Sequence, residues 1–176
     1  IWYTPPSGLS GEVWIESVRA DRLTALKITP NYEKRQVTIG LSASNDRLPI
    51  EVKVTFEGKA IAKGVAKEKR EITRDLGENL HPWNPENPSL YDLEIKVGKD
   101  VVHSYFGLRD FASVDYEGNR VVGINGKPTF LSGPLDQGYW QESGLSAPDF
   151  EALLFDLTKM KECGFNMIRK HIKIEP

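Results

Sequence analysis

The sequence predicts a mainly β protein, in which an antiparallel β-sandwich of immunoglobulin type is followed by the first β-α-β portion of a parallel α/β domain. Two observations support this prediction. Over the first two-thirds of the chain, segments with alternating apolar and polar residues recur about every 8–12 residues, separated by turn residues. After about residue 112, one segment of helical period lies between two short apolar segments, an order that favours a parallel sheet.

The strands of the sandwich are predicted where the alternation is regular. They are residues 11–20, Leu23–Pro30, Arg35–Ser44, Ile50–Phe56, Ala60–Val65, Lys69–Leu76, Leu90–Val97 and Val101–Leu108. Turn residues at 57–59 and 98–100 predict hairpins between neighbouring strands. The proline-rich segment 81–88 cannot be a central strand and is predicted to be an extended loop crossing the sandwich. The cysteine pair of antibody domains is absent, so the likeness is one of architecture.

The pattern changes after residue 112. Short strands are predicted at Ser113–Tyr116, Arg120–Ile124 and Pro128–Leu131, with Asn125-Gly126 as a type I′ hairpin signal. An irregular loop follows at residues 132–145. A second, parallel domain is therefore expected to begin here.

A single helix is predicted in this second domain. Ser146 and Asp149 have the spacing of a capping box, and Gly164 is expected to end the helix. Its apolar stripe has helical spacing and consists of Phe150, Leu153, Leu154, Leu157 and Met160. Residues Phe165–Ile168 are then predicted to form a short buried strand.

The composition excludes several classes of protein. Of the 176 residues, 39% are hydrophobic and 27% are charged, which is ordinary for a globular protein. The net charge of −2 provides no basic surface for nucleic acid or for an anionic membrane. No apolar run approaches the roughly 20 residues that span a membrane. The single cysteine, Cys163, excludes an internal disulfide and is predicted to be a small buried hydrophobe.

Candidate functional residues lie after the predicted parallel strands, because α/β barrels build their active sites at the C-terminal ends of their strands. Asp136 and Trp140 lie in the loop before the helix, and Arg169 and His171 follow the last predicted strand. Carboxylate and imidazole groups can hydrogen-bond sugar hydroxyls, and an indole can stack on a pyranose ring. Arg169 is the strongest candidate, because a charged residue directly after an apolar strand must emerge from a core.

Other polar residues carry weaker signals. Lys170 and Lys173 are expected on a solvated face, and Glu175 is a carboxylate without an assigned role. His81 and His103 have no cysteine, histidine or carboxylate cluster at metal-ligand spacing, so no metal site and no cofactor are predicted.

Five segments resemble motifs of glycoside hydrolase family 2, the group of β-galactosidases, β-glucuronidases and β-mannosidases, and they occur in the order of that family. They are residues 3–16 (YTPPSGL to VWIE), 83–91 (WNPENPSLY), 106–109 (FGLR), 125–133 (NGKP to LSG) and 164–169 (GFNMIR). Each motif alone is weak, and together they cover nearly the whole chain.

The resemblance implies a parent of three parts. Residues 1–10 would be the tail of an N-terminal jelly-roll domain or its linker, 11–112 the immunoglobulin-like sandwich, and 113–176 the truncated start of a (β/α)8 TIM-barrel catalytic domain. Such enzymes are retaining glycosidases with two catalytic glutamates whose carboxyl groups lie about 5–5.5 Å apart. Neither glutamate is expected in this chain. The fragment is therefore expected to be inactive and to pack, in its parent, against the missing jelly-roll and barrel domains.

The resemblance also implies roles for residues of this sequence. Arg169 matches the family arginine near the nucleophile, and Asp136 lies where relatives place groups that bind the sugar. His171 is one residue short of the position of the family histidine, and Ser132 stands where many relatives have arginine. A set of four residues is expected to bind the substrate and position the nucleophile of the parent: Arg169, His171, Asp136 and Trp140. The resemblance leaves the sugar open, and also the compartment, whether the bacterial cytoplasm, the periplasm or the extracellular space.

An alternative of another class is a stand-alone β-sandwich that serves as a carbohydrate-binding or interaction module. The two differ in what they predict for the second domain. A single β-α-β unit cut from a barrel would expose apolar residues of its helix and self-associate, whereas an independent extension would be rigid and monomeric.

Overall fold

The computed structural model describes residues 8, 13–67 and 70–171. Their contacts divide the chain into two compact units. We call Ser17–Thr129 the β unit, and the described residues of Ile1–Glu16 and Phe130–Pro176 the helical unit.

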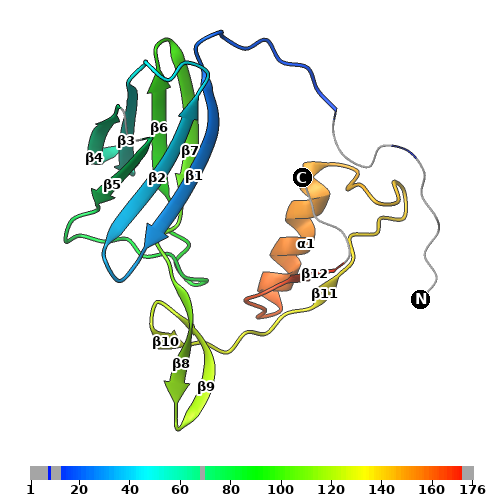
Figure 1. The fold of residues 1–176 in the computed structure, drawn as a ribbon. Helices are drawn as coiled ribbons and strands as arrows, with labels where there is room; N and C mark the ends of the chain where they lie inside the picture. The colour runs from blue at the N-terminus through cyan, green and yellow to red at the C-terminus, as the bar shows by residue number, and fades with distance from the viewer. Residues whose placement is uncertain (1–7, 9–12, 68–69, 172–176) are drawn as a thin grey trace. The chain divides into compact units, whose positions relative to one another are not determined.

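Seven strands of the β unit form its two main antiparallel sheets, whose strands are labelled in Figure 1. The strands are β1 (Leu23–Asn31), β2 (Gln36–Ala43), β3 (Ile50–Phe56), β4 (Lys59–Ala66), β5 (Glu71–Asp75), β6 (Tyr91–Val97) and β7 (Asp100–Phe106). One sheet has the order β1-β2-β5 and the other β4-β3-β6-β7. These strands match the predicted segments closely, since turn residues mark both ends of each.

One hydrophobic core is shared by the two sheets. Alternate residues of β3 and β6 are buried, as the period of two requires, and their neighbours carry charges on the other face. The core residues are Val37, Ile39, Leu41, Ile50, Val52, Val54, Ala66, Ile72, Leu76, Tyr91, Leu93, Ile95, Val97, Phe106 and Leu108. Tyr91 is fully buried, and its ring stacks on Phe106 with centroids 5.2 Å apart.

The edges of the two sheets are joined by Arg74 on β5. Its Nε donates to the carbonyl oxygen of Lys63 on β4 at 2.8 Å. Its guanidinium occupies the space next to Gly64, where a Cβ would overlap it. Gly64 therefore leaves room for this arginine while it stays paired with Val52 on β3.

The proline-rich loop 81–88 lies beside the end of β7. The Trp83 N–H donates to the Leu108 carbonyl at 3.0 Å, which confirms an extended segment outside the strands. The Arg109 guanidinium lies over the Trp83 ring, 4.6 Å from its centroid.

A hairpin completes the β unit. It consists of β8 (Phe111–Tyr116), β9 (Asn119–Ile124) and β10 (Lys127–Pro128). Asn125 and Gly126 have φ angles of 53° and 75°, as a type I′ turn requires, so the predicted Asn-Gly hairpin is confirmed. The predicted strand Pro128–Leu131 is wrong beyond Pro128, where β10 ends. The Thr129 N–H still donates to the Val122 carbonyl, but Phe130 is 87% exposed, and the described residues give it no apolar face to pack on.

The predicted strand at 11–20 is also wrong over residues 13–20, and residues 11 and 12 lie outside the described residues. Val13, Trp14 and Ile15 are 74%, 71% and 100% exposed. Apolar alternation produces a strand only where a neighbouring strand supplies hydrogen bonds and another layer covers the apolar face. The structure provides neither along the described part of this segment.

The helical unit contains α1 (Phe150–Glu162) and the two short strands β11 (Leu135–Asp136) and β12 (Arg169–Lys170). The strands are parallel, so the predicted strand-helix-strand order is confirmed. Both strands lie elsewhere than predicted: β11 falls inside the supposed irregular loop, and Phe165–Ile168 forms no strand.

Two details of α1 differ from prediction. Asp149 itself is the N-cap, because its side chain accepts a hydrogen bond from the Ala152 N–H at 2.7 Å. Cys163 is exposed, not buried. Among the described residues no side chain of α1 is buried, so the apolar stripe lacks the cover that a core would give it.

Candidate functional site

The candidate site lies at the C-terminal edge of the parallel strands β11 and β12. The Arg169 N–H donates to the Pro134 carbonyl at 3.0 Å, and the His171 N–H donates to the Asp136 carbonyl at 2.8 Å. These bonds fix a register in which Leu135 faces Arg169 and Asp136 faces Lys170. The two strands thus present polar residues at one edge, where α/β folds bind ligands.

The Asn166 side chain connects the segment before β12 to the segment before β11 by two hydrogen bonds. Its Oδ1 accepts from the Ser132 N–H at 2.9 Å, and its Nδ2 donates to the Phe130 carbonyl at 2.9 Å. Gly133 passes so close to Met167 that a Cβ would overlap the Met167 carbonyl group. The sequence therefore places an amide and a glycine where two backbones must meet.

Asp136 is the best anchored of the predicted site residues. Its Oδ1 accepts from the Gly138 N–H, and its Oδ2 pairs with Lys170 Nζ, both at 2.7 Å. The Lys170 and Asp136 side chains are 25% and 28% exposed. The ion pair is therefore partly shielded from water, which makes it stronger than a pair on an open surface.

Lys170 is the residue that the sequence interpretation missed, since it was assigned to a solvated face. The signal that could have found it is the register of the parallel strands. Once β11 includes Asp136, the residue opposite on β12 is Lys170.

The other predicted residues are less engaged. The Arg169 side chain is exposed. Trp140 pairs with Gly144 through backbone hydrogen bonds of 2.8 and 2.9 Å. Among the described residues, Trp140 Nε1 and His171 Nδ1 are buried without a hydrogen-bond partner, and Glu175 lies outside those residues. Two buried polar atoms of this kind cost free energy unless something satisfies them.

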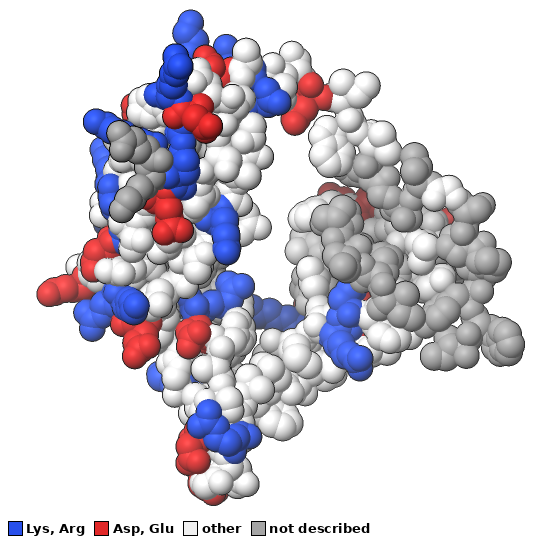
Figure 2. Space-filling model, in the orientation of Figure 1, with Lys and Arg blue, Asp and Glu red and all other residues white. Residues whose placement is uncertain are grey.

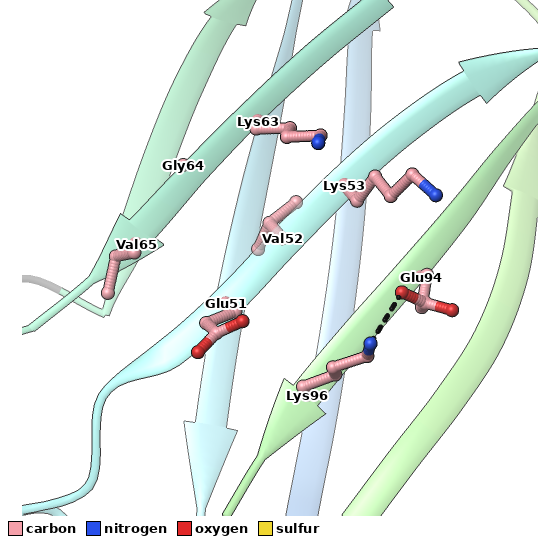
Figure 3. A pocket seen from close by; sticks show the side chains of 8 residues that line it. All are labelled: Glu51, Val52, Lys53, Lys63, Gly64, Val65, Glu94 and Lys96. Carbon is pink, nitrogen blue, oxygen red and sulfur yellow. Dashed lines mark ion pairs between the residues drawn. The ribbon is translucent and has the colours of Figure 1, made fainter. Parts of the chain in front are cut away.

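A second polar region lies on the outer face of the β4-β3-β6-β7 sheet. A shallow hollow there is lined by Glu51, Val52, Lys53, Lys63, Gly64, Val65, Glu94 and Lys96 (Figure 3). Lys96 Nζ lies 3.1 Å from Glu94 Oε1, and this hydrogen bond lowers the pKa of the Glu94 carboxyl. Basic and acidic side chains both line this hollow, so this face has the character of a solvated sheet surface. Both signs of charge are also interspersed over the side of the β unit seen in Figure 2.

Within residues 8, 13–67 and 70–171, no three histidine, cysteine or carboxylate side chains gather in a way that could hold a metal ion. In the same part of the chain, no helix is both long and apolar enough to cross a membrane.

Two curated relatives match this chain in sequence. A putative β-glucuronidase of Formosa agariphila is 23% identical over 174 residues, which cover 92% of this chain and 21% of that protein. The β-galactosidase large subunit of Lactobacillus helveticus is 27% identical over 109 residues, 58% of this chain and 17% of that protein. The chain therefore spans about a fifth of the length of these relatives.

Among solved structures, Faecalibacterium prausnitzii β-glucuronidase matches with a TM-score of 0.73 and 22% identity, covering 86% of this chain and 24% of that one. A β-glucuronidase from an uncultured Clostridium species matches with a TM-score of 0.72 and 19% identity, covering 87% and 26%. These likenesses show a shared, mainly β fold. The model of the family "Glycosyl hydrolases family 2" matches residues 22–109, half of the 176 residues. The chain belongs to glycosyl hydrolase family 2.

Proposed function

We propose that this chain is part of a retaining β-glycosidase that hydrolyses the O-glycosidic bonds of β-linked sugars. Membership of the family and the β-glucuronidase and β-galactosidase relatives support a carbohydrate substrate. The single observation that supports it most is the polar edge at β11 and β12, because it lies at the C-terminal ends of parallel strands next to the family-like segments.

The proposal assigns a role to each part of the chain. Residues 11–112 form an immunoglobulin-like sandwich that supports the catalytic domain, in keeping with the antiparallel sheets β1-β2-β5 and β4-β3-β6-β7 around one core. Residues 113–176 begin a (β/α)8 barrel, in keeping with the parallel β11-α1-β12 order. Residues 1–10 end a jelly-roll domain or its linker.

Incompleteness of the barrel explains the exposed helix. Phe150, Leu154 and Leu157 are 70%, 50% and 53% exposed, and Phe165 is 37% exposed. In the full-length enzyme these side chains pack against the remainder of the barrel. The catalytic acid/base and nucleophile glutamates lie on later barrel strands, so the chain alone is inactive.

Site roles follow from the polar edge. Asp136 accepts hydrogen bonds from sugar hydroxyls. The buried indole N–H of Trp140 donates a hydrogen bond to an oxygen of the sugar. Arg169, exposed at the end of β12, fixes the nucleophile carboxylate through paired hydrogen bonds. His171, with a buried Nδ1 atom, completes the sugar-binding edge.

A panel of aryl β-glycosides and β-glucuronides assayed with the full-length protein tests this function. Hydrolysis with retention of anomeric configuration supports it, and absence of turnover on every member contradicts it. Arg169→Ala should lower kcat by orders of magnitude, because the nucleophile loses its partner. Arg47→Ala is the matched control, since Arg47 is an exposed arginine of the β unit. Equal activity of both variants would remove Arg169 from the site.

A further inference from the structure

The backbone of β11 and β12 determines the position of the Asp136–Lys170 ion pair. The ammonium and carboxylate come from neighbouring parallel strands whose backbone hydrogen bonds fix the register. A slip of one residue would turn Lys170 to the opposite face of the strand, so the register alone places its side chain beside Asp136.

The Asp136 carboxylate is held at both oxygens. The Gly138 N–H orients Oδ1 from the loop, and Lys170 Nζ orients Oδ2 from β12, each at 2.7 Å. Gly138 has a φ of +63°, which lets the loop turn back on the carboxylate. Each donor restricts rotation of the carboxylate about its side-chain torsions.

The pair differs from the other close lysine pair of this unit. Lys159 Nζ and Glu162 Oε2 are also 2.7 Å apart, but their side chains are 54% and 56% exposed and lie within α1. A pair of that kind contributes about 0.3–0.5 kcal/mol. The Lys170 pair is half as exposed and links two strands at the candidate edge.

We infer that Lys170 is a positioning residue for substrate binding, which acts by orienting the Asp136 carboxylate toward the hydroxyl groups of the sugar. The inference rests on the proposed glycosidase function. The substrate class is a β-glycoside with a free hydroxyl that donates to Asp136, so Lys170 contributes to sugar specificity through that hydroxyl.

The test is a double-mutant cycle in the full-length enzyme with the best aryl β-glycoside of the panel. Lys170→Met and Asp136→Asn are each expected to lower kcat/KM at least tenfold, and the double variant no further than the worse single variant. Lys170→Arg should restore part of the loss. The matched control is Lys159→Met, which should leave kcat/KM unchanged.

A second arm uses monodeoxy analogues of the same glycoside. If Lys170 acts through Asp136, both single variants lose discrimination against the same deoxy position. A purely structural role would lower activity on all analogues alike and would give additive losses in the cycle. That result, or unchanged kcat/KM in Lys170→Met, overturns the inference about Lys170. Hydrolysis by the unsubstituted enzyme would still uphold the glycosidase function in that case. Absence of hydrolysis by the unsubstituted enzyme overturns the function itself, and the positioning role with it.

Discussion

The side-chain amide of Asn125 donates from Nδ2 to the carbonyl oxygen of Trp83 at 2.9 Å, across 42 residues of sequence. The same side chain accepts from the Asp110 N–H through Oδ1, also at 2.9 Å. One asparagine thus ties the hairpin to the proline-rich loop of the β unit. Its φ of 53° adds a second requirement, because asparagine tolerates the left-handed region better than most residues.

Replacement of Asn125 should destabilise the β unit. Asn125→Ala leaves the Trp83 carbonyl and the Asp110 N–H without their partner and strains the backbone, at a cost of about 2–3 kcal/mol in the free energy of unfolding. Asn125→Gly should cost less, because glycine accepts the positive φ. Urea unfolding measures both. Glu117→Ala is the control, since Glu117 has a φ of 50° in an exposed turn. A loss no greater than that of the control would show that the two hydrogen bonds contribute nothing.

Gly133 should not tolerate a side chain. Gly133→Ala forces apart the backbones of Gly133 and Met167, which separates β11 from β12 and disrupts the candidate site. In the full-length protein we expect a lower Tm and loss of activity. The neighbouring Ser132→Ala removes a hydroxyl without adding volume and serves as the control. Wild-type Tm and activity in Gly133→Ala would contradict the close approach of these backbones.

Alkaline pH should weaken the β unit through Tyr91. Burial raises the pKa of its hydroxyl, while the hydrogen bond from the His81 N–H partly opposes the shift. The unfolded tyrosine loses its proton near pH 10, whereas the folded one keeps it to higher pH, so the free energy of unfolding falls as pH rises above about 10. Unfolding of wild type and Tyr91→Phe at pH 7 and pH 10.5 checks this. At pH 7, Tyr91→Phe should lower the free energy of unfolding by about 1 kcal/mol, because the hydrogen bond with the His81 N–H is lost. Between pH 7 and pH 10.5, the free energy of unfolding of this variant should fall less than that of wild type. An equal fall in the free energy of unfolding for both proteins would contradict the raised pKa of Tyr91.

Gly64 and Arg74 should be energetically coupled. Gly64→Ala displaces the guanidinium from the Lys63 carbonyl, and Arg74→Ala removes the same contact. Each change is expected to cost about 1 kcal/mol, and the double variant little more than one of them. Urea unfolding of the four proteins gives the coupling energy. Additivity within about 0.5 kcal/mol would show that the arginine does not join the two sheets.

The exposed stripe of α1 should make the chain self-associate when it is studied without further sequence. Leu154→Lys and Leu157→Lys place charges on that stripe and should shift the sedimentation profile toward monomer. Leu90→Lys is the control, since Leu90 is 42% exposed on the β unit. A monomeric wild-type chain with a rigid helical unit in hydrogen exchange would contradict the proposal that residues 113–176 begin a barrel.

The sequence was most informative where turn chemistry and alternation agree. The strands from Leu23 to Phe106 were predicted because each has an apolar face and defined turns, and Asn125-Gly126 marked the hairpin unambiguously. Residues 13–20 were misassigned because alternation says nothing about whether a neighbouring strand exists. The strands β11 and β12 are two residues each, too short for any periodicity to show.

The candidate site was only partly predictable for the same reason. Asp136 could be predicted as a site residue from its place in the loop before the helix. The partners of its carboxylate could not be predicted from the sequence. Lys170 becomes a partner of Asp136 only through the register of two strands that are 34 residues apart in sequence. Long-range pairing of this kind is a property of the folded backbone, and residue types carry no local sign of it.

The two hydrogen bonds of the Asn125 side chain also depend on the chemical stability of its amide. Glycine after asparagine leaves the following amide nitrogen unhindered. Attack of this nitrogen on the side-chain carbonyl releases ammonia and forms a cyclic imide, which water then opens, in the aspartate product, to a side-chain carboxylate. At Asn125-Gly126 the atom lost is Nδ2, the donor to Trp83. The carboxylate that replaces it would face the Trp83 carbonyl, oxygen against oxygen. Ageing of a single dipeptide would therefore loosen the hairpin from the loop that holds it.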